Sequence, residues 1–282
     1  MALDYSLSRS EAPTTEYDSA QRRHPAVEEL LELARYRELL WLWSLRNLTL
    51  RYKRSALGIV WSLLEPLMMM AILSIVFTAI FRFSVAFYPL YVLSGLILFD
   101  FFSRSTNQMI DEMITSQHLA ARIYTPRSAF ALAAVSTQLV HWLIALIPLF
   151  AIMLIMGAPF SWSILTLPFG MLLTALFAVG VGLFIATVGA FFHDVKLAYQ
   201  VLMTAWLYAT PIIYPIEIVP EGWRRLFVLN PLFHLCALVR DPIFRGHSAP
   251  LESWVVAVVA SLATALLGWW FFTRRRDAFG YL

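Results

Sequence analysis

Residues 128–192 read SAFALAAVSTQLVHWLIALIPLFAIMLIMGAPFSWSILTLPFGMLLTALFAVGVGLFIATVGAFF and contain no Asp, Glu, Lys or Arg. This uncharged run is far longer than the roughly 20 apolar residues that one membrane-spanning helix needs. It divides at Gly157-Ala158-Pro159, a cluster of the kind that ends helices. The run therefore predicts two spanning helices, at about Ala129–Met156 and Leu165–Phe191, in a protein whose main solvent is lipid.

The composition of the whole chain agrees with a membrane protein. Of its 282 residues, 60% are hydrophobic and only 14% are charged, whereas soluble domains carry about 25% charged residues. The 21 Lys and Arg residues exceed the 18 acidic residues by three, and they do not form the basic stripe that nucleic-acid binding requires. We therefore expect membrane lipid as a partner and no nucleic acid. The single Cys236 excludes an intrachain disulfide framework.

Four further apolar stretches complete the predicted spans. The first, about Gly58–Phe81, contains Glu65. The second, about Tyr88–Phe102, is short unless it continues past its charged residues toward Ile114. The last two lie at about Leu197–Tyr214 and Trp254–Phe272. The sequence thus predicts an all-α integral membrane protein with six transmembrane helices, in a domain of residues 58–273.

The distribution of basic residues predicts the orientation, because cytoplasmic flanks collect Lys and Arg. One side holds Arg46, Arg51, Lys53, Arg54, Arg104, Arg122, Arg127, Lys196, Arg274, Arg275 and Arg276. The other side has Arg82, an uncharged loop at 157–163, and a 215–252 segment whose arginines are balanced by acidic residues. Both termini are therefore predicted to be cytoplasmic. A different division of residues 128–192 into spans would reverse the predicted orientation of every later span.

Polar segments flank the six predicted spans. Residues 1–24 have the composition of a disordered cytoplasmic tail, and residues 274–282 form a cytoplasmic C-terminal tail. Residues 25–57 combine an amphipathic helix that carries Trp43 with a basic segment. This pattern suits a helix lying in the membrane interface, although a cytoplasmic helix packed on a partner has the same pattern.

Two long connections lie between the predicted spans. The cytoplasmic loop at 104–128 is either an ordinary solvated loop or a docking element for a soluble partner. The external segment at 215–252 contains two amphipathic pieces, Trp223–Leu229 and Leu232–Val239. We expect two short re-entrant helices there, which dip into the outer leaflet, with a simple surface cap as the alternative. Four apolar residues of the second piece share one helical face: Leu232, Leu235, Cys236 and Val239.

The chain shows no signature of an enzyme. It has no GxxxxGK[ST] motif, so it cannot bind ATP in a P-loop, and it has no HExxH, GxSxG or metal-ligand spacing. Ionisable groups within spans are costly in lipid. Glu65 either lines a polar pathway, pairs with a basic partner or lies near the headgroups, while Asp100 and Arg104 have the i, i+4 spacing of an ion pair. Small residues at 178, 182, 186 and 190 share a face that predicts close helix packing, within the chain or in a dimer.

Several motifs resemble one known family. Residues 46–58, RNLTLRYKRSALG, and 61–67, WSLLEPL, are similar to the start of the membrane subunits of ABC-type polysaccharide and polyol-phosphate exporters. These exporters carry O-antigen, capsule, teichoic acid and related glycans. Three later stretches agree in order: RIYTPR at 122–127, HDV at 193–195 with TPIIYP at 210–215, and NPL at 230–232 with RD at 240–241. Residues 1–37 extend ahead of the motif, and Glu65 stands where Asn is more usual.

The resemblance implies a homodimer in the bacterial cytoplasmic (inner) membrane, with two copies of a separate ATPase subunit that hold ATP and Mg; it implies no cofactor in this chain. It implies that the 104–128 loop couples to the ATPase and that the substrate is a polyprenyl-pyrophosphate-linked glycan. The coupling residues expected are Gln117, His118, Arg122, Tyr124 and Arg127. The lipid diphosphate is expected at Arg46, Arg51, Lys53 and Arg54, because arginine matches phosphate oxygens, although cytoplasmic topology alone accounts for the same residues. The pathway or gate residues expected are Glu65, Tyr214 and Arg240.

Other functions remain compatible with a six-span protein. An ABC permease for a small amphiphile or drug is one, and a membrane enzyme acting on polyprenyl phosphates is another. The first is disfavoured by the motif at 46–66, and the second by the lack of an acidic and basic cluster on one side. An ion channel or secondary transporter would need polar residues lining several spans, and such residues are few here.

Overall fold

The computed structural model describes residues 29, 33, 36–53, 57–81, 85–115, 127–192 and 194–275. Within these ranges the chain forms helices and no strands, as predicted for an all-α protein. The α-helices are α2 (Arg37–Tyr52), α3 (Trp61–Ile75), α4 (Tyr88–Thr115), α6 (Arg127–Ile155), α7 (Leu167–Phe191), α8 (Asp194–Tyr208), α9 (Glu221–Val228), α10 (Pro231–Phe244) and α11 (Leu251–Arg275). Short 3-10 turns lie at Gly58–Val60, Trp162–Thr166 and Ile216–Ile218, and a π-helical turn, Val76–Ile80, extends α3.

Four described helical stretches are long and apolar enough to cross a membrane: Trp61–Ile80, Ser128–Ile155, Trp162–Phe191 and Leu251–Arg275. A fifth is possible if α9 and α10, which meet at 86°, count as one broken span. Helix α4 is long enough but carries charged residues in its second half, and α8 has only 15 residues. The protein is therefore a multi-pass membrane protein, and the number of six spans stays a prediction.

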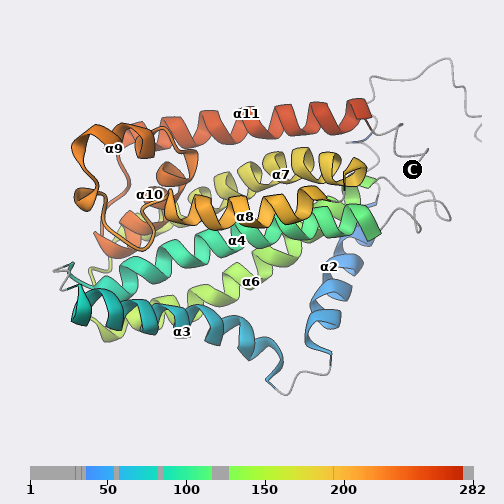
Figure 1. Ribbon diagram of the computed structural model, residues 1–282. Coiled ribbons are helices and arrows are strands. Elements are labelled where there is room, and N and C mark those ends of the chain that lie inside the picture. The colour runs from blue at the N-terminus through green and yellow to red at the C-terminus, as the bar shows by residue number, and fades with distance from the viewer. Residues whose placement is uncertain are drawn as a thin grey trace, which may run out of the picture.

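The long helices form one bundle in which successive helices run in opposite directions. Figure 1 shows that α3, α4, α6, α7, α8 and α11 alternate along the bundle axis. The end of the bundle where α2 lies, α8 begins and α11 ends is called the inner end here. The end where α9 and α10 lie is called the outer end. Because α8 arrives at the outer end and α11 departs from it, α9 and α10 lie between these two helices as a bent pair. A broken span and the predicted re-entrant pair both agree with this bend.

Small residues bring α7 into close contact with its neighbours. A Cβ atom on Gly180 would lie 2.3 Å from the backbone carbon of Thr264, and one on Gly268 would lie 2.1 Å from the Gly180 oxygen. On another side of α7, a Cβ atom on Gly182 would lie 2.2 Å from the Met109 sulfur of α4. The four residues of the predicted small-residue face, Ala178, Gly182, Ala186 and Ala190, are all buried. This face therefore packs within the chain rather than in a dimer contact.

Helix α2 runs steeply across the inner end of the bundle rather than along it (Figure 1). Its Trp43 ring stacks on Phe130 of α6 with 3.8 Å between ring centres, and the buried Ser44 hydroxyl donates to the Ala133 oxygen at 3.4 Å. The opposite face exposes Trp41 and Leu42, each 60% accessible. An apolar face that the chain leaves uncovered suits the membrane interface, and the position of α2 in that interface stays a prediction. Predicted helical residues between 25 and 35 lie mostly outside the described part.

The structure decides one boundary that the sequence left open and corrects another. The second predicted span takes its longer form: α4 continues past its charged residues, which form ion pairs with neighbouring side chains, so the loop expected from residue 104 is helical as far as Thr115. The remaining connection, 116–126, lies outside the described residues. The fifth predicted span, expected to reach Tyr214, ends as a helix at Tyr208. Pro211 explains this earlier end, because a proline disfavours helical geometry in the residue before it.

Candidate functional site

The chain leaves the end of α8 in an irregular turn whose carbonyl groups are bound by neighbouring helices. Tyr88 of α4 donates its hydroxyl to the Ile213 oxygen at 2.6 Å. The hydroxyl of Tyr91, one helical turn later, lies 3.1 Å from the oxygens of both Pro211 and Tyr214. Buried carbonyl groups without partners are costly, so these tyrosines stabilise the break in the helix.

Arg240 of α10 completes this cluster. It donates to the Pro211 oxygen at 2.9 Å and to the Ile212 oxygen at 3.2 Å, and only 8% of the residue is exposed. Its guanidinium carbon lies 3.8 Å from the centre of the Tyr91 ring, within the range of a cation–π contact. Gly95 makes room for it, since a Cβ atom there would lie 2.5 Å from the guanidinium. The outer cluster is defined as Tyr88, Tyr91, Arg240 and the 210–214 turn.

Asn230 joins the start of α10 to the end of α8. Its side-chain oxygen accepts from the Leu232 amide at 3.1 Å, which caps α10, and from the Trp206 indole at 3.0 Å. Its amide donates to the Thr210 hydroxyl at 2.8 Å. An asparagine cap followed by proline is a strong helix start. Helix α10 is therefore attached to α8 through Asn230 and to the turn after α8 through Arg240.

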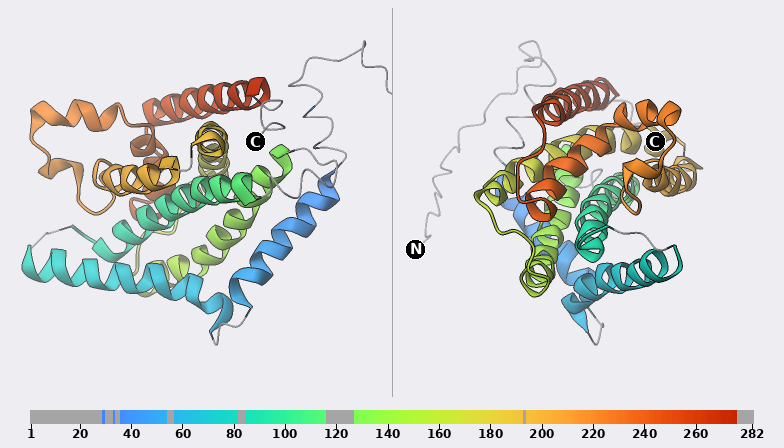
Figure 2. Two further views of the ribbon diagram at one scale, coloured as in Figure 1. Left: turned by 45° about the vertical axis from the view of Figure 1, so that its right-hand side comes forward. Right: turned by 90° about the vertical axis from the view of Figure 1, so that its left-hand side faces the viewer.

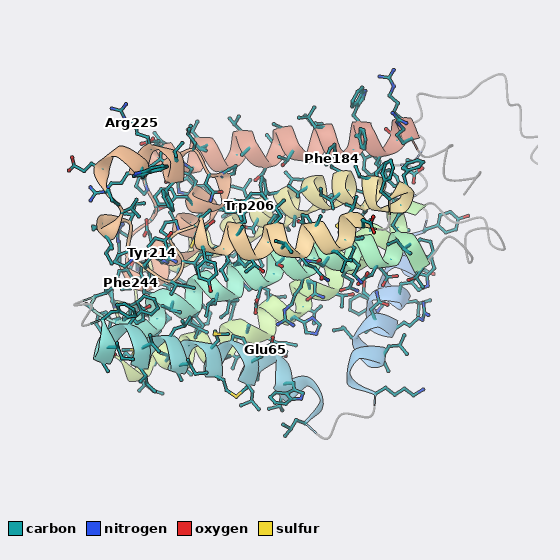
Figure 3. All side chains as sticks on the ribbon, viewed as in Figure 1. Glu65, Phe184, Trp206, Tyr214, Arg225 and Phe244 are labelled. Atoms are coloured by element: carbon teal, nitrogen blue, oxygen red, sulfur yellow. The ribbon has the colours of Figure 1, made fainter. Side chains whose placement is uncertain are left out.

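A cavity of about 340 Å³ lies beside the outer cluster. Its wall combines aromatic rings from Tyr91 and Phe233 with the charged side chains Glu217, Asp241, Arg245 and Glu252. Figure 3 shows Tyr214, Phe244 and Arg225 at this same outer end. The cavity therefore has a mixed wall of apolar and charged side chains, and it is bordered by α4, α10 and the start of α11.

A second polar cluster lies toward the inner end, around Arg104 of α4. The guanidinium lies 2.6 Å from Glu65 of α3 and 3.5 Å from Asp100 of its own helix. Gln138 of α6 donates to Gln108 of α4 at 2.6 Å. These five residues define the inner cluster. A cavity of about 360 Å³, bordered by α2, α4 and α6, includes Arg104, Gln108 and Gln138 in its wall.

Two further polar contacts bind the end of α4 to other helices. Asn47 of α2 donates to the Glu112 carboxylate at 2.9 Å, and Lys196 of α8 pairs with Asp111 at 2.5 Å. Glu112 lies in the last turn of α4, beyond the apolar part of the helix. Burial raises the pKa of its carboxyl, and hydrogen bonds from Gln108 and Asn47 offset part of that increase. Polar contacts therefore connect the inner end of α4 to both α2 and α8.

The sequence profile described as ABC-2 type transporter matches residues 38–244, which is well over half of the chain. The chain belongs to this family. It is 26% identical over 258 residues to the O-antigen export system permease protein RfbA of Myxococcus xanthus, covering 88% of this chain and 96% of the relative. A Klebsiella pneumoniae protein of the same name is 26% identical over 211 residues, covering 74% and 81%. The polysialic acid transport protein KpsM of Escherichia coli is 24% identical over 248 residues, covering 83% and 92%.

The residues expected to bind a lipid diphosphate in this ABC-2 transporter chain are only partly described. Arg46 and Lys53 are exposed on and just after α2, at the inner end. The side chain of Arg51 and the whole of Arg54 lie outside the described residues, as do Gln117, His118, Arg122 and Tyr124. Arg127 begins α6, and its side chain is not described. The coupling and diphosphate assignments therefore stay predictions.

The three expected pathway or gate residues fall in the two clusters. Glu65 pairs with Arg104, one of the alternatives that the sequence left open, and the predicted Asp100–Arg104 pair is present at 3.5 Å. Arg240 and Tyr214 belong to the outer end, where the Tyr214 hydroxyl donates to the Tyr208 oxygen. The Arg240 guanidinium donates to backbone carbonyl groups, so its position suits a role in stabilising the outer end. Whether these residues border a pathway stays a prediction.

Sequence reasoning missed four residues that hold the clusters together: Tyr88, Tyr91, Gln108 and Gln138. The two tyrosines are spaced i, i+3 at the start of an apolar helix, a spacing that places them on one face. The two glutamines are neutral polar residues within predicted helices, and such groups seek partners on adjacent helices in a membrane. Within the described ranges, no group of three His, Cys, Asp or Glu side chains is placed to hold a metal ion.

Proposed function

We propose that this chain is the membrane subunit of an ATP-driven exporter that carries a polyprenyl-pyrophosphate-linked polysaccharide across the bacterial inner membrane. The observation that carries the proposal is the near end-to-end match to a permease named for O-antigen export, which covers 96% of that relative. A relative named for polysialic acid transport covers a similar range. Permeases of this family obtain energy from a separate ATPase subunit, so we expect ATP and Mg in that partner.

The inner end is proposed to face the cytoplasm and the ATPase. Exposed Arg46 and Lys53 lie there, with Arg274 and Arg275 at the end of α11. Basic residues favour the cytoplasmic side of a membrane. The 116–126 connection follows α4 at this end, and its motif with Arg122 and Arg127 is the proposed coupling element. Polar contacts from Glu112 and Asp111 would transmit a displacement there to α2 and α8.

A homodimer is proposed because α3 has little support from its own chain. Among the described side chains of Trp61–Ile80, Pro66 alone is buried. Glu65 of α3 pairs with Arg104 of α4, and both side chains are partly exposed. A second subunit packed against this helix would supply the contacts that one subunit lacks, and polysaccharide would pass between the two copies. Arg46, Arg51, Lys53 and Arg54 would receive the diphosphate at the inner headgroups, where arginine forks match phosphate oxygens.

The test is co-purification of the tagged chain with the ATPase encoded beside it, followed by ATP hydrolysis in nanodiscs. We expect a complex with two copies of each subunit by native mass spectrometry, and hydrolysis stimulated by a polyprenyl-pyrophosphate-linked glycan. The double variant Arg122→Glu/Arg127→Glu should lose ATPase activity. Arg225→Glu, at the outer end, is the matched charge reversal and should keep it.

Three outcomes separate the parts of the proposal. A chain that binds no ATPase subunit contradicts the exporter and favours an enzyme acting on polyprenyl phosphates. A complex stimulated by small amphiphiles and not by the lipid-linked glycan contradicts the substrate class. An intact complex whose activity is unchanged by the double reversal contradicts the assignment of the coupling element while leaving the function standing.

A further inference from the structure

A groove of about 380 Å³ opens between α8 and α11, with α7 as its floor. Phe184 of α7, Trp206 of α8 and Leu267 of α11 line its three sides. Figure 3 shows Trp206 and Phe184 on the two helices, with Phe184 nearer the inner end. The close contact of Gly180 with α11 brings α7 and α11 together beneath the groove. The groove is therefore a preformed feature of helix packing.

The groove has few polar groups that could bind water. The Trp206 indole nitrogen is directed to Asn230 at 3.0 Å, and the Thr264 hydroxyl donates to the Ala260 oxygen at 2.7 Å. Tyr199 and Trp270 each carry one further polar group, and the other lining side chains are hydrocarbon. Apolar surfaces of this kind do not hold ordered water. Leu202 and Leu267 are 51% and 63% exposed. In a bilayer, hydrocarbon chains are the solvent that meets such a surface.

Cationic side chains follow at the inner mouth of the groove. Trp270 lines the groove, and the Arg274 guanidinium lies 5.2 Å from the centre of its ring. Arg275 is the next residue, and both arginines are exposed at the end of α11. A tryptophan beside arginines at the end of a span is typical of the headgroup region. The apolar groove and its cationic mouth thus follow one another in the same order as the acyl chain and the phosphate of a phospholipid.

We propose that the groove between α7, α8 and α11 binds one acyl chain of an anionic phospholipid whose phosphate lies against Arg274 and Arg275. Juxtamembrane arginines attract anionic lipid headgroups, and guanidinium groups bind phosphate oxygens with charge-assisted hydrogen bonds. A second copy of the chain is a less suitable occupant. The weakly supported α3 lies on the opposite side of the bundle from α11 in both views of Figure 2, so a dimer in which the two copies of α3 meet leaves the groove facing lipid.

The test uses the full chain in nanodiscs of equal parts phosphatidylglycerol and phosphatidylcholine, followed by detergent extraction and native mass spectrometry. Leu267→Trp fills the groove. Its matched control is Leu266→Trp, since Leu266 is exposed beside it and does not line the groove. Arg274→Gln/Arg275→Gln removes the cationic mouth, and Arg225→Gln, on the exposed face of α9, is the control for loss of an exposed positive charge.

The wild-type chain should retain phosphatidylglycerol in preference to phosphatidylcholine. Leu267→Trp should abolish the preference, and the arginine variant should reduce retention by about fivefold for each arginine removed. Both controls should behave as the wild type. Size-exclusion elution and the midpoint of thermal unfolding establish that each variant is folded, and the arginine variant, which changes only exposed residues, carries the test if Leu267→Trp does not fold.

Four results would overturn the proposal. These are equal retention of the two lipids, unchanged retention in both test variants, loss of the dimer in Leu267→Trp, and preferential retention of a polyprenyl phosphate when that lipid is added to the same nanodiscs. The third would assign the groove to a second copy of the chain. The fourth would assign it to the substrate.

Discussion

The guanidinium of Arg240 lies 3.8 Å from the centre of the Tyr91 ring, and both side chains reach the carbonyl oxygen of Pro211. Three elements meet at this point: the start of α4, the irregular turn after α8, and helix α10. A single buried charge thus holds the outer end of the bundle together by binding backbone oxygens. Any opening at this end that moves α10 away from α8 must break these contacts.

Replacement of Arg240 with leucine should destabilise the outer end. Two buried carbonyl groups lose a charged donor, and each such hydrogen bond contributes about 1.5–3 kcal/mol. We expect a loss of about 3 kcal/mol or more, measured as a lower midpoint of thermal unfolding in nanodiscs. Arg240→Lys should recover part of the loss because one ammonium group can still donate. Arg225→Leu on the exposed face of α9 should change the midpoint little; an equal effect of the two leucine variants would contradict the role of Arg240.

Replacement of Gly180 with alanine should separate α7 from α11. The new methyl group would meet backbone atoms of Thr264 at 2.3 Å, and backbone cannot move aside as a flexible side chain can. Overpacking of this kind costs about 1–3 kcal/mol, measurable as a lower thermal midpoint. Gly222→Ala is the matched control, since nothing lies within 4 Å of its added methyl group. A stable Gly180→Ala variant would show that the two helices do not pack this closely.

The Glu65–Arg104 pair should contribute little to the free energy of unfolding, but it should restrict the motion of α3 relative to α4. The side chains are 58% and 30% exposed, and exposed ion pairs contribute about 0.2–1 kcal/mol. We expect Glu65→Gln and Arg104→Gln to increase the mobility of a spin label at Met69 on α3. The double variant should resemble either single one. Fully additive effects on mobility would mean that the two residues act independently.

Replacement of Asn47 with alanine should loosen α2 from the end of α4. The change removes the 2.9 Å hydrogen bond to Glu112 and should cost about 1 kcal/mol. Amide hydrogen exchange should become faster in α2 and in the last turn of α4. Thr49→Ala removes a hydroxyl that bonds only to its own helix, at the Leu45 oxygen, and should leave α4 unchanged. Equal exchange in the two variants would contradict a link through Asn47.

Much of this architecture could be predicted from the residues alone. The uncharged run at 128–192 indicated two spanning helices, and the structure has α6 and α7 there, separated by the predicted break. The apolar face of Leu232, Leu235, Cys236 and Val239 is buried in α10 as the helical spacing implied. One predicted helix end is wrong, since α8 stops at Tyr208. The sequence left open how far α4 continues past Asp100 and Arg104, because that depends on the ion-pair partners of these charges.

The sequence by itself determined that this is a helical membrane protein of the ABC-2 type, because low charge content, long apolar runs and ordered motifs need no three-dimensional information. Only the tertiary structure decided which polar groups meet: Arg104 with Glu65, Gln138 with Gln108, and Arg240 with the turn after α8. The physical reason is that helices which are apolar all round have no distinct buried face in their sequence. Close contacts such as that of Gly180 with α11 decide how each helix is rotated about its axis. The rotation in turn decides which partner each polar group within the helices meets.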